Sequence, residues 1–265
     1  MKKAVLFDLD DTLLWDERSI DEAFAETCQL AQETYRKINP EELEKSVRNT
    51  AKELYATYET FPFTKMIGIN PFEGLWGRFR DDEDNFRQLS AIVPTYRKEA
   101  WTKGLQAIGI DDPKLGETLA ERFPQIRRTK HYVYDDTYPT LERLVGKVKL
   151  LLLTNGSPDL QHEKLAGVSK LPPYFDHILV SGSFGRGKPE PALFRHALDM
   201  LNVLPEEAVM VGDKLTTDID GANQTGITSV WINRKHKKRD HPIIPDYEIN
   251  RLEEIHHIIE QLNEE

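Results

Sequence analysis

Cysteine, basic residues and long apolar runs are all scarce in this sequence, and each shortage excludes a class of protein. Cys28 is the single cysteine among 265 residues, so no disulfide can form within the chain, which suits a reducing compartment. The 35 lysines and arginines are outnumbered by 45 acids, and the formal net charge is −10, which makes nucleic acid and anionic membranes poor partners. No apolar run approaches the roughly 20 residues of a membrane-spanning helix. We therefore expect a cytoplasmic protein without a nucleic-acid or membrane partner.

Short apolar runs are present, and they alternate with helix-like stretches. The runs are "AVLF" at residues 4–7, "KVKLLLLT" ending at Thr154, "DHILVS" ending at Ser181, "AVMVGD" ending at Asp213 and "ITSVWI" ending at Ile232. Continuous apolar runs of this length suit strands that are buried on both faces of a sheet. Two of the stretches between them open with helix-start signals. The pattern predicts an α/β fold with a doubly wound, mostly parallel, Rossmann-like sheet.

The segment between the first and second apolar runs has a different pattern. Apolar residues such as Leu43 and Val47 recur there at helical spacing, and no convincing strand signal is present. We therefore predict an α/β core domain formed by residues 1–14 and 134–265, with an all-helical domain at residues 15–133 inserted after the first strand.

Polar residues follow the expected strands where each strand ends. In chain order they are Asp8, Asp10, Asp11 and Thr12; Thr154, Asn155 and Gly156; Lys188; and Asp213 and Asp218. Ligands in open α/β sheets bind beyond the carboxyl ends of the strands, so we expect these groups to gather at one edge. Four of the acids sum to −4 and the lysine returns +1. A phosphate would be repelled by that sum unless a cation such as Mg²⁺, which prefers oxygen ligands, neutralised part of it.

These residue types suit phosphoryl transfer. A metal ion, a lysine, a threonine hydroxyl and backbone amides together can hold a phosphoryl group. A carboxylate can act as nucleophile and form an aspartyl-phosphate that water later opens. A second acid two residues further along can protonate the leaving oxygen and then activate the water.

The four motifs together resemble those of the haloacid dehalogenase-like (HAD) superfamily. They are "DLDDT" at residues 8–12, "TNG" at 154–156, "KP" at 188–189 and "GDKLTTD" at 212–218. The resemblance implies that the helical insertion is a cap domain, which closes over the site and selects the substrate. Closure would exclude bulk water and strengthen the interactions inside.

The resemblance also implies a role for each motif residue. The catalytic residues would be Asp8 as nucleophile, Asp10 as general acid and base, and Lys188, which balances charge. The substrate phosphoryl group would be bound by Thr154, Asn155, Gly156 and Lys188. The Mg²⁺ ligands would be Asp8, the backbone carbonyl of Asp10, and Asp213. Asp218 would lie behind them and orient Lys188 or a metal-bound water.

The implied function is a Mg²⁺-dependent phosphatase that hydrolyses a small-metabolite phosphomonoester, with phosphoserine, a sugar phosphate or a nucleoside monophosphate as candidates. A phosphotransferase such as a sugar-phosphate mutase would share every core motif and stays open. A haloacid dehalogenase is disfavoured because those enzymes lack an acid at the position of Asp10. A phosphorylation-dependent signalling module and a catalytically inactive binding protein are further alternatives. The protein could be a monomer or a homodimer.

Outside the motifs, other polar groups have ordinary interpretations. Arg78 and Arg80 could meet a substrate carboxylate or phosphate, but the pattern favours surface arginines. The basic run "RKHKKRDH" at residues 234–241 is expected to be a solvated loop. His256 and His257 are expected on the surface of a C-terminal amphipathic helix.

Overall fold

A computed structural model describes residues 1–239 and 241–264. Contacts divide the chain into two compact units, one formed by Met1–Trp15, Val133–Gly156 and Val168–Glu265, the other by Asp16–Tyr132 and Ser157–Gly167. The segment Ser157–Gly167 falls within the expected core range, yet it packs with the inserted helices. The roles of the two units as catalytic core and substrate-selecting cap stay predictions.

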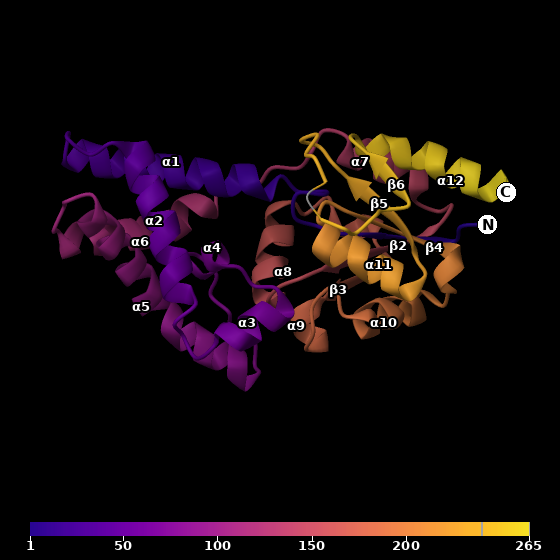
Figure 1. Cartoon of the computed structure of the whole chain (residues 1–265), viewed down its shortest axis with the longest axis horizontal. Coiled ribbons are helices and arrows are strands. Elements are labelled where there is room, and N and C mark those ends of the chain that lie inside the picture. Colours follow the sequence, from indigo (N-terminus) through magenta and orange to yellow (C-terminus); the bar gives the residue numbers. More distant parts are fainter. Residues whose placement is uncertain (240, 265) are drawn as a thin grey trace. The chain divides into compact units, whose positions relative to one another are not determined.

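The first unit is built on one parallel sheet (Figure 1). The described strands are β1 (Ala4–Phe7), β2 (Lys149–Thr154), β3 (His177–Val180), β4 (Ala208–Gly212), β5 (Thr228–Ile232) and β6 (Tyr247–Ile249). Their order across the sheet is β3-β2-β1-β4-β5-β6, and every neighbouring pair is parallel. The predicted α/β fold is therefore confirmed. The short β6 strand at the edge was not anticipated.

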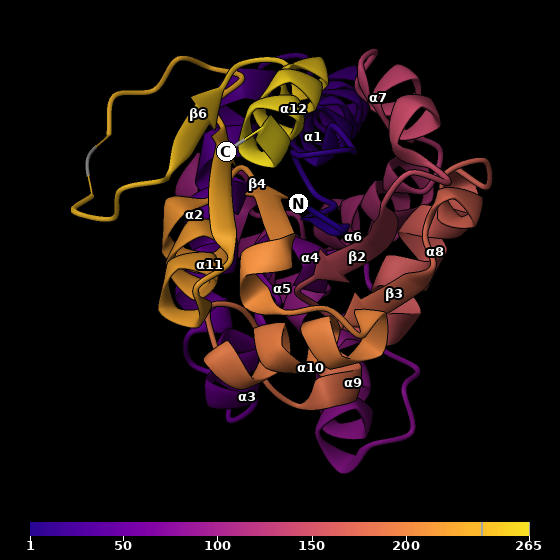
Figure 2. The same cartoon turned by 90° about the vertical axis from the view of Figure 1, so that its right-hand side faces the viewer.

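Helices cover both faces of this sheet (Figure 2). They are α7 (Thr137–Leu144), α9 (Ser181–Phe184), α10 (Pro191–Leu201), α11 (Asp220–Thr225) and α12 (Ile255–Glu264), with short turns at Pro172–Tyr174, Pro205–Glu207, Leu215–Ile219 and Leu252–Glu254. Apolar side chains of α10 and α11 pack against one face of the strands in a single core cluster. The α7 and α12 helices lie on the opposite face. All four residues of β1 are fully buried, as expected for a central strand covered on both sides.

The α12 helix corrects one expectation about its two histidines. His257 is exposed, but His256 is buried and only 7% exposed. His256 is three residues before Ile259, so the two side chains share one face of the helix, and that face packs inward. The expected surface position is therefore wrong for His256.

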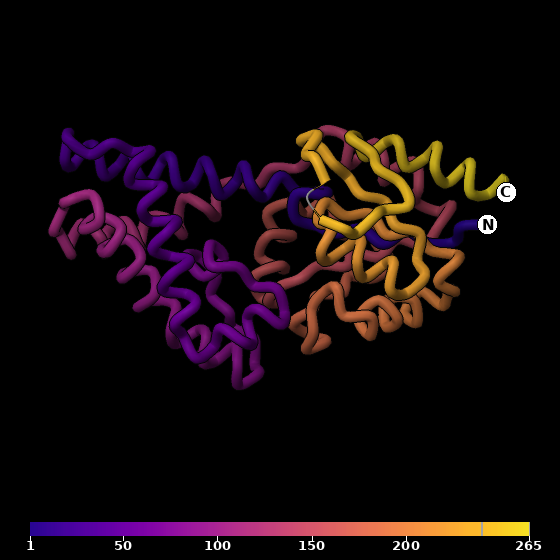
Figure 3. Tube along the Cα trace, viewed as in Figure 1, coloured from indigo at the N-terminus to yellow at the C-terminus, as the bar shows by residue number. Residues whose placement is uncertain are grey.

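The second unit is entirely helical in the residues described. Its helices are α1 (Asp16–Thr34), α2 (Pro40–Tyr55), α3 (Phe61–Ile67), α4 (Pro71–Gly74), α5 (Asp84–Ala107), α6 (Pro113–Arg127) and α8 (Pro158–Gly167). Figure 3 traces their path along the chain. Asn39 caps α2 and Asp112 caps α6, each by accepting two backbone N–H bonds ahead of a proline. No helix in the described parts of the chain is both long and apolar enough to cross a bilayer.

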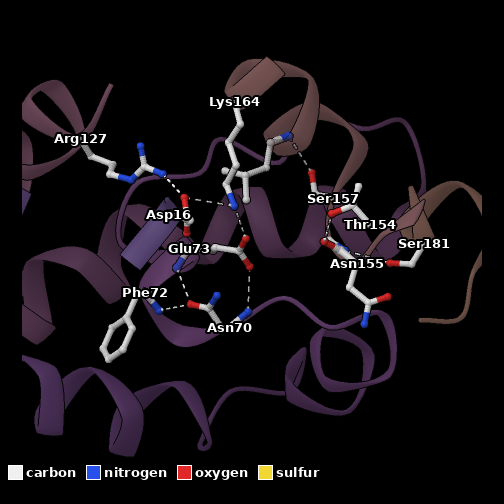
Figure 4. A network of polar contacts seen from close by, with 12 residues as sticks. Asp16, Asn70, Phe72, Glu73, Arg127, Thr154, Asn155, Ser157, Lys164 and Ser181 are labelled. Atoms are coloured by element: carbon white, nitrogen blue, oxygen red, sulfur yellow. Dashed lines mark hydrogen bonds and ion pairs between the residues drawn. The ribbon is translucent and has the colours of Figure 1, made fainter. Parts of the chain in front are cut away.

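A buried network of four charged side chains joins α8 to the rest of this unit (Figure 4). Lys164 of α8 lies 3.0 Å from Glu73 and 3.7 Å from Asp16, and Arg127 donates to Asp16. Glu73 also accepts from the backbone amide of Asn70 at 3.0 Å. Burial alone would raise the pKa of Asp16, but Lys164 and Arg127 outweigh it and hold that pKa below its usual value. The network explains why α8 packs with the inserted helices.

Candidate active site

Three acidic side chains lie together at the carboxyl edge of the sheet. Asp8 directly follows β1 and Asp213 directly follows β4. Asp218 lies in the π-helical turn Leu215–Ile219 that comes next. Each offers one carboxylate oxygen, and these oxygens lie within 4.8 Å of one another. Because β1 and β4 are adjacent and parallel, their carboxyl ends bring the three acids to one place.

Lys188 supplies positive charge to this acidic cluster. Its ammonium Nζ donates to Asp8 Oδ1 at 2.6 Å and to Leu153 O at 2.8 Å, and lies 2.7 Å from Asp218 Oδ1. Three contacts match the three donors of an ammonium group. The side chain is only 2% exposed, so water competes little for these contacts. One lysine therefore serves two buried carboxylates.

The cluster holds more negative charge than this lysine neutralises. Burial raises the pKa of Asp8 to about 6, although Lys188 lowers it. Burial, followed by the charges of Asp8 and Asp218, raises the pKa of Asp213 well above its usual value. Burial alone would lower the pKa of Lys188, but Asp218 and Asp8 outweigh it and raise that pKa. All three shifts have the direction expected where acids are crowded in a low dielectric, which a further cation would relieve.

The turn after β1 gives the two oxygens of Asp8 different partners. The amide of Leu13 donates to Leu9 O at 3.0 Å and closes the turn. This turn places Thr12 so that its Oγ1 donates to Asp8 Oδ2 at 3.1 Å, while Oδ1 faces Lys188. Asp10 lies in the same turn and is half-buried. Its role as general acid and base stays a prediction.

The segment after β2 fixes the backbone of Lys188. Asn155 Oδ1 accepts from the Lys188 amide at 2.8 Å, and Asn155 Nδ2 donates to Lys188 O at 3.2 Å. Gly156 has a φ of 133° and donates its amide to Ser181 Oγ at 2.9 Å. The Asn155 side chain therefore positions the lysine. Phosphoryl binding by Thr154, Asn155 and Gly156 stays a prediction.

Asp218 is held by its neighbours in a way that suits a supporting role. Its Oδ1 faces Lys188 at 2.7 Å and its Oδ2 accepts from the Lys214 amide at 3.0 Å. A Cβ on Gly212 would lie 2.3 Å from the Cβ and Cγ of Asp218. Only glycine therefore leaves room for this acid beside β4, which accounts for the glycine directly before Asp213.

A family model described as haloacid dehalogenase-like hydrolase matches residues 2–226. This chain belongs to that family. A phosphoserine phosphatase of Thermus thermophilus is 35% identical over 258 residues, which cover 96% of this chain and 97% of that protein. A glyceraldehyde 3-phosphate phosphatase of Methanopyrus kandleri is 33% identical over 191 residues, covering 68% and 81%. The expected enzyme class, a HAD-like phosphoric monoester hydrolase, is thereby confirmed.

Among solved structures, the HAD hydrolase YfnB of Bacillus subtilis superposes on this chain with a TM-score of 0.67. The two chains are 23% identical, and the match covers 97% of this chain and 98% of that one. At this identity the likeness concerns the fold, and it agrees with the parallel sheet and the helical insertion.

The acidic edge of this HAD-like hydrolase fits a divalent cation. Asp8 and Asp213 offer carboxylate oxygens, the donors that Mg²⁺ prefers. Burial, and after it the charges of neighbouring acids, raise the pKa of both carboxyl groups, and a bound cation would offset these charges. Asp218 contributes to the same cluster, but its two oxygens already contact Lys188 and the Lys214 amide. The residues present therefore suit a metal held by Asp8 and Asp213, with Asp218 behind them.

The basic run at residues 234–241 holds a residue that sequence reasoning missed. Arg234 binds Asp136 through two bonds of 2.9 Å and also donates to Thr12 O at 2.9 Å. The expectation of a solvated loop is therefore wrong for Arg234. Residues 235–239 are exposed, and Asp240 lies outside the described residues. Arg234 anchors the turn that carries the Thr12 hydroxyl.

The environment of Arg234 makes this anchor strong. Asp136 is 1% exposed. Burial alone would raise the pKa of Asp136, but hydrogen bonds from Arg234 and the Leu252 amide hold it below its usual value. The Arg234 guanidinium also lies 3.7 Å from the centre of the Tyr134 ring, which stacks on Trp15 at 5.2 Å. The local sequence around Tyr134 and Asp136 contains no pattern that would indicate their contacts with Arg234.

The arginines considered as specificity residues lie on the surface of the helical unit. Arg78 is exposed, and Arg80 binds Asp159 at 2.9 Å with its side chain 61% exposed. Trp76 is 1% exposed and belongs to the apolar core of the unit. The two arginines therefore lie at the surface, as the sequence pattern favours.

Proposed function

We propose that this HAD-like hydrolase cleaves a small-metabolite phosphomonoester through an aspartyl-phosphate on Asp8. The observation that carries the proposal is the environment of Asp8. Its buried carboxylate accepts hydrogen bonds from Lys188 and the Thr12 hydroxyl, and it lies in a cluster with two further acids. A carboxylate held in this way can attack without first losing a proton to a base. Bound Mg²⁺ would supply positive charge beside the oxygens of the phosphoryl group.

The proposed reaction proceeds in two steps. An oxygen of Asp8 attacks the phosphorus, and the bond between phosphorus and the substrate oxygen breaks while Asp10 gives that oxygen a proton. Water then attacks the phosphorus, Asp10 takes a proton from it, and inorganic phosphate and the free Asp8 carboxylate are released. Lys188 keeps Asp8 oriented and offsets the negative charge that gathers as the phosphate approaches.

We propose phosphoserine as the first substrate to test. The support is the identity of 35% with the Thermus thermophilus phosphoserine phosphatase along almost the whole of both chains. The second substrate to test is glyceraldehyde 3-phosphate, which appears in the name of the Methanopyrus kandleri relative. A panel of phosphorylated metabolites, read by phosphate release, ranks them by kcat/KM. Phosphoserine should lead, and a leading sugar phosphate or nucleotide would contradict this assignment.

Two variants test the chemistry independently of the substrate. With p-nitrophenyl phosphate and Mg²⁺, Asp8→Asn should abolish turnover, and Asp10→Asn should reduce it strongly while the far-ultraviolet circular dichroism stays unchanged. EDTA should stop the unmodified enzyme, and added Mg²⁺ should restore it. Normal turnover by Asp8→Asn would show that another group is the nucleophile.

A further inference from the structure

A groove lies at the opposite edge of the sheet from the acidic cluster. It has a volume of about 710 Å³ and is lined by Lys3 before β1, Lys149 at the start of β2 and Asp176 before β3. These positions are the amino ends of the strands, and all of the lining residues belong to the first unit. Small-molecule sites commonly have volumes of about 300–1,000 Å³. The groove is thus large enough for a metabolite.

One side chain lining this groove lacks a partner that its burial requires. His256 is 7% exposed, and its Nε2 is buried without a hydrogen-bond partner in the described residues. A buried polar atom left without a partner is costly, because it has lost its hydrogen bonds to water and gained none in return. His256 lines the groove, so a modest turn of its side chain would bring Nε2 to the groove, where a ligand oxygen would accept its hydrogen bond.

Two cations beside His256 are free to meet such a ligand. Arg143 and Lys147 line the groove and are exposed, and no side-chain ion pair or side-chain hydrogen bond of either is found within the described residues. Burial and then the charges of these two residues lower the pKa of His256, while Glu260 and Glu253 oppose them. The ring is therefore neutral at neutral pH, and the cations lie close enough to act on it.

The other lysines that line the groove already have partners, and the described lining residues include only two acids. Lys2 donates to Glu206 O and Thr228, and Lys149 donates to Leu201 O. Lys3 pairs with Glu207 at 2.5 Å. The two lining acids are Asp176, which accepts from the Leu150 amide, and Glu260, and both oppose an anion, but they are outnumbered by the lining lysines and arginine. Basic residues near the end of α7 also complement its helix dipole, but that role gives the buried histidine no partner.

Apolar side chains complete the lining. Val145 is 49% exposed at the groove, beside Val148, and the ring of Tyr174 lies among the lining residues. We propose that the groove binds a small organic anion, whose oxyanion head group contacts Arg143, Lys147 and His256 and whose apolar body covers these side chains. This site is separate from the acidic cluster and does not depend on the proposed phosphatase activity.

Two anionic probes and one neutral probe test the proposal. Benzoate carries a carboxylate, phenylphosphonate carries a phosphonate that a phosphatase cannot hydrolyse, and benzyl alcohol has a similar ring without charge. Binding is followed by nuclear magnetic resonance on the ring signals of His256, assigned with His256→Gln. The anion that fits the head-group site should shift these signals saturably, and benzyl alcohol should bind at least about tenfold more weakly.

A pair of charge-matched variants shows whether the groove itself is responsible. Arg143→Ala/Lys147→Ala removes the two groove cations, and Arg195→Ala/Lys238→Ala removes two exposed cations elsewhere in the same unit. We expect the first variant to lose about tenfold or more in affinity and the second to match the unmodified protein.

Three results would overturn the proposal. The His256 signals could stay unmoved by both anions, the two double variants could lose affinity equally, or benzyl alcohol could bind as tightly as the anions. If none of these results is found, the affinities of benzoate and phenylphosphonate show whether the groove prefers a carboxylate or a phosphate-like head group.

Discussion

Replacing Lys188 with methionine should destabilise the fold as well as remove activity. The lysine lies 2.6 Å from Asp8 and 2.7 Å from Asp218, and its side chain is 2% exposed. With an effective dielectric of about 20, charges at such distances attract by about 6 kcal/mol per pair. Desolvation of the three groups offsets much of this attraction, and breaking a buried pair typically costs about 3–5 kcal/mol. We expect a loss within that range for Lys188→Met.

The same reasoning predicts that a second substitution repairs stability without repairing activity. Lys188→Met leaves two buried carboxylates without their cation, and Asp218→Asn then removes one of those charges. The double variant should therefore be more stable than Lys188→Met alone, while both stay inactive. Lys214→Met is the matched control, because that side chain is exposed on the neighbouring turn and should change stability by about 0.5 kcal/mol or less.

Urea unfolding followed by circular dichroism measures the stability of these variants, and p-nitrophenyl phosphate turnover measures their activity. A double variant less stable than Lys188→Met would refute the reasoning, because it would mean that Asp218 stabilises the fold without its lysine. Unchanged stability of Lys188→Met would refute it as well.

Three further predictions concern other parts of the molecule. The pKa of Asp136 in the folded state lies below its unfolded value of about 3.9. The unmodified protein should therefore be more stable than Asp136→Asn above about pH 4, and this difference should vanish as the pH falls through the folded-state pKa. Melting temperatures of both proteins across pH check this. Gly212→Ala should displace Asp218 and lower both kcat and the melting temperature, since the new Cβ would lie 2.3 Å from that acid. Lys164→Met should cost about 3–5 kcal/mol in urea unfolding, and adding Glu73→Gln should recover part of it, because their contact is 3.0 Å and buried.

The strands and the acidic edge could be predicted because they depend on short-range patterns. A buried parallel strand appears as a continuous apolar run, and the residue after it lies at the carboxyl edge of the sheet. These two rules together predict from the sequence that Asp8 and Asp213 lie at one edge. Asp11 follows in the same turn with a φ of 60°, a conformation that aspartate tolerates better than most residues, which suits a turn position rather than a catalytic one.

The features that were missed depend on contacts between distant residues. Arg234 lies in a run that looks solvated, yet its carboxylate partner Asp136 is 98 residues away. The α8 helix follows a core strand in sequence, but Lys164 meets Glu73, 91 residues earlier. His256 carried a weak signal, because it is three residues before Ile259 on the buried face of α12. Local periodicity contains no record of such long-range partners.

Trapping the intermediate tests the central claim most directly. The enzyme is mixed with phosphoserine or p-nitrophenyl phosphate in the presence of Mg²⁺, quenched during turnover, and treated with borohydride, which reduces an aspartyl-phosphate to homoserine. Mass spectrometry of the peptide that spans β1 and the following turn then locates the modified residue. The account predicts homoserine at position 8 and none in Asp8→Asn. Steady hydrolysis with no modification there, or with modification at another acid, would contradict it.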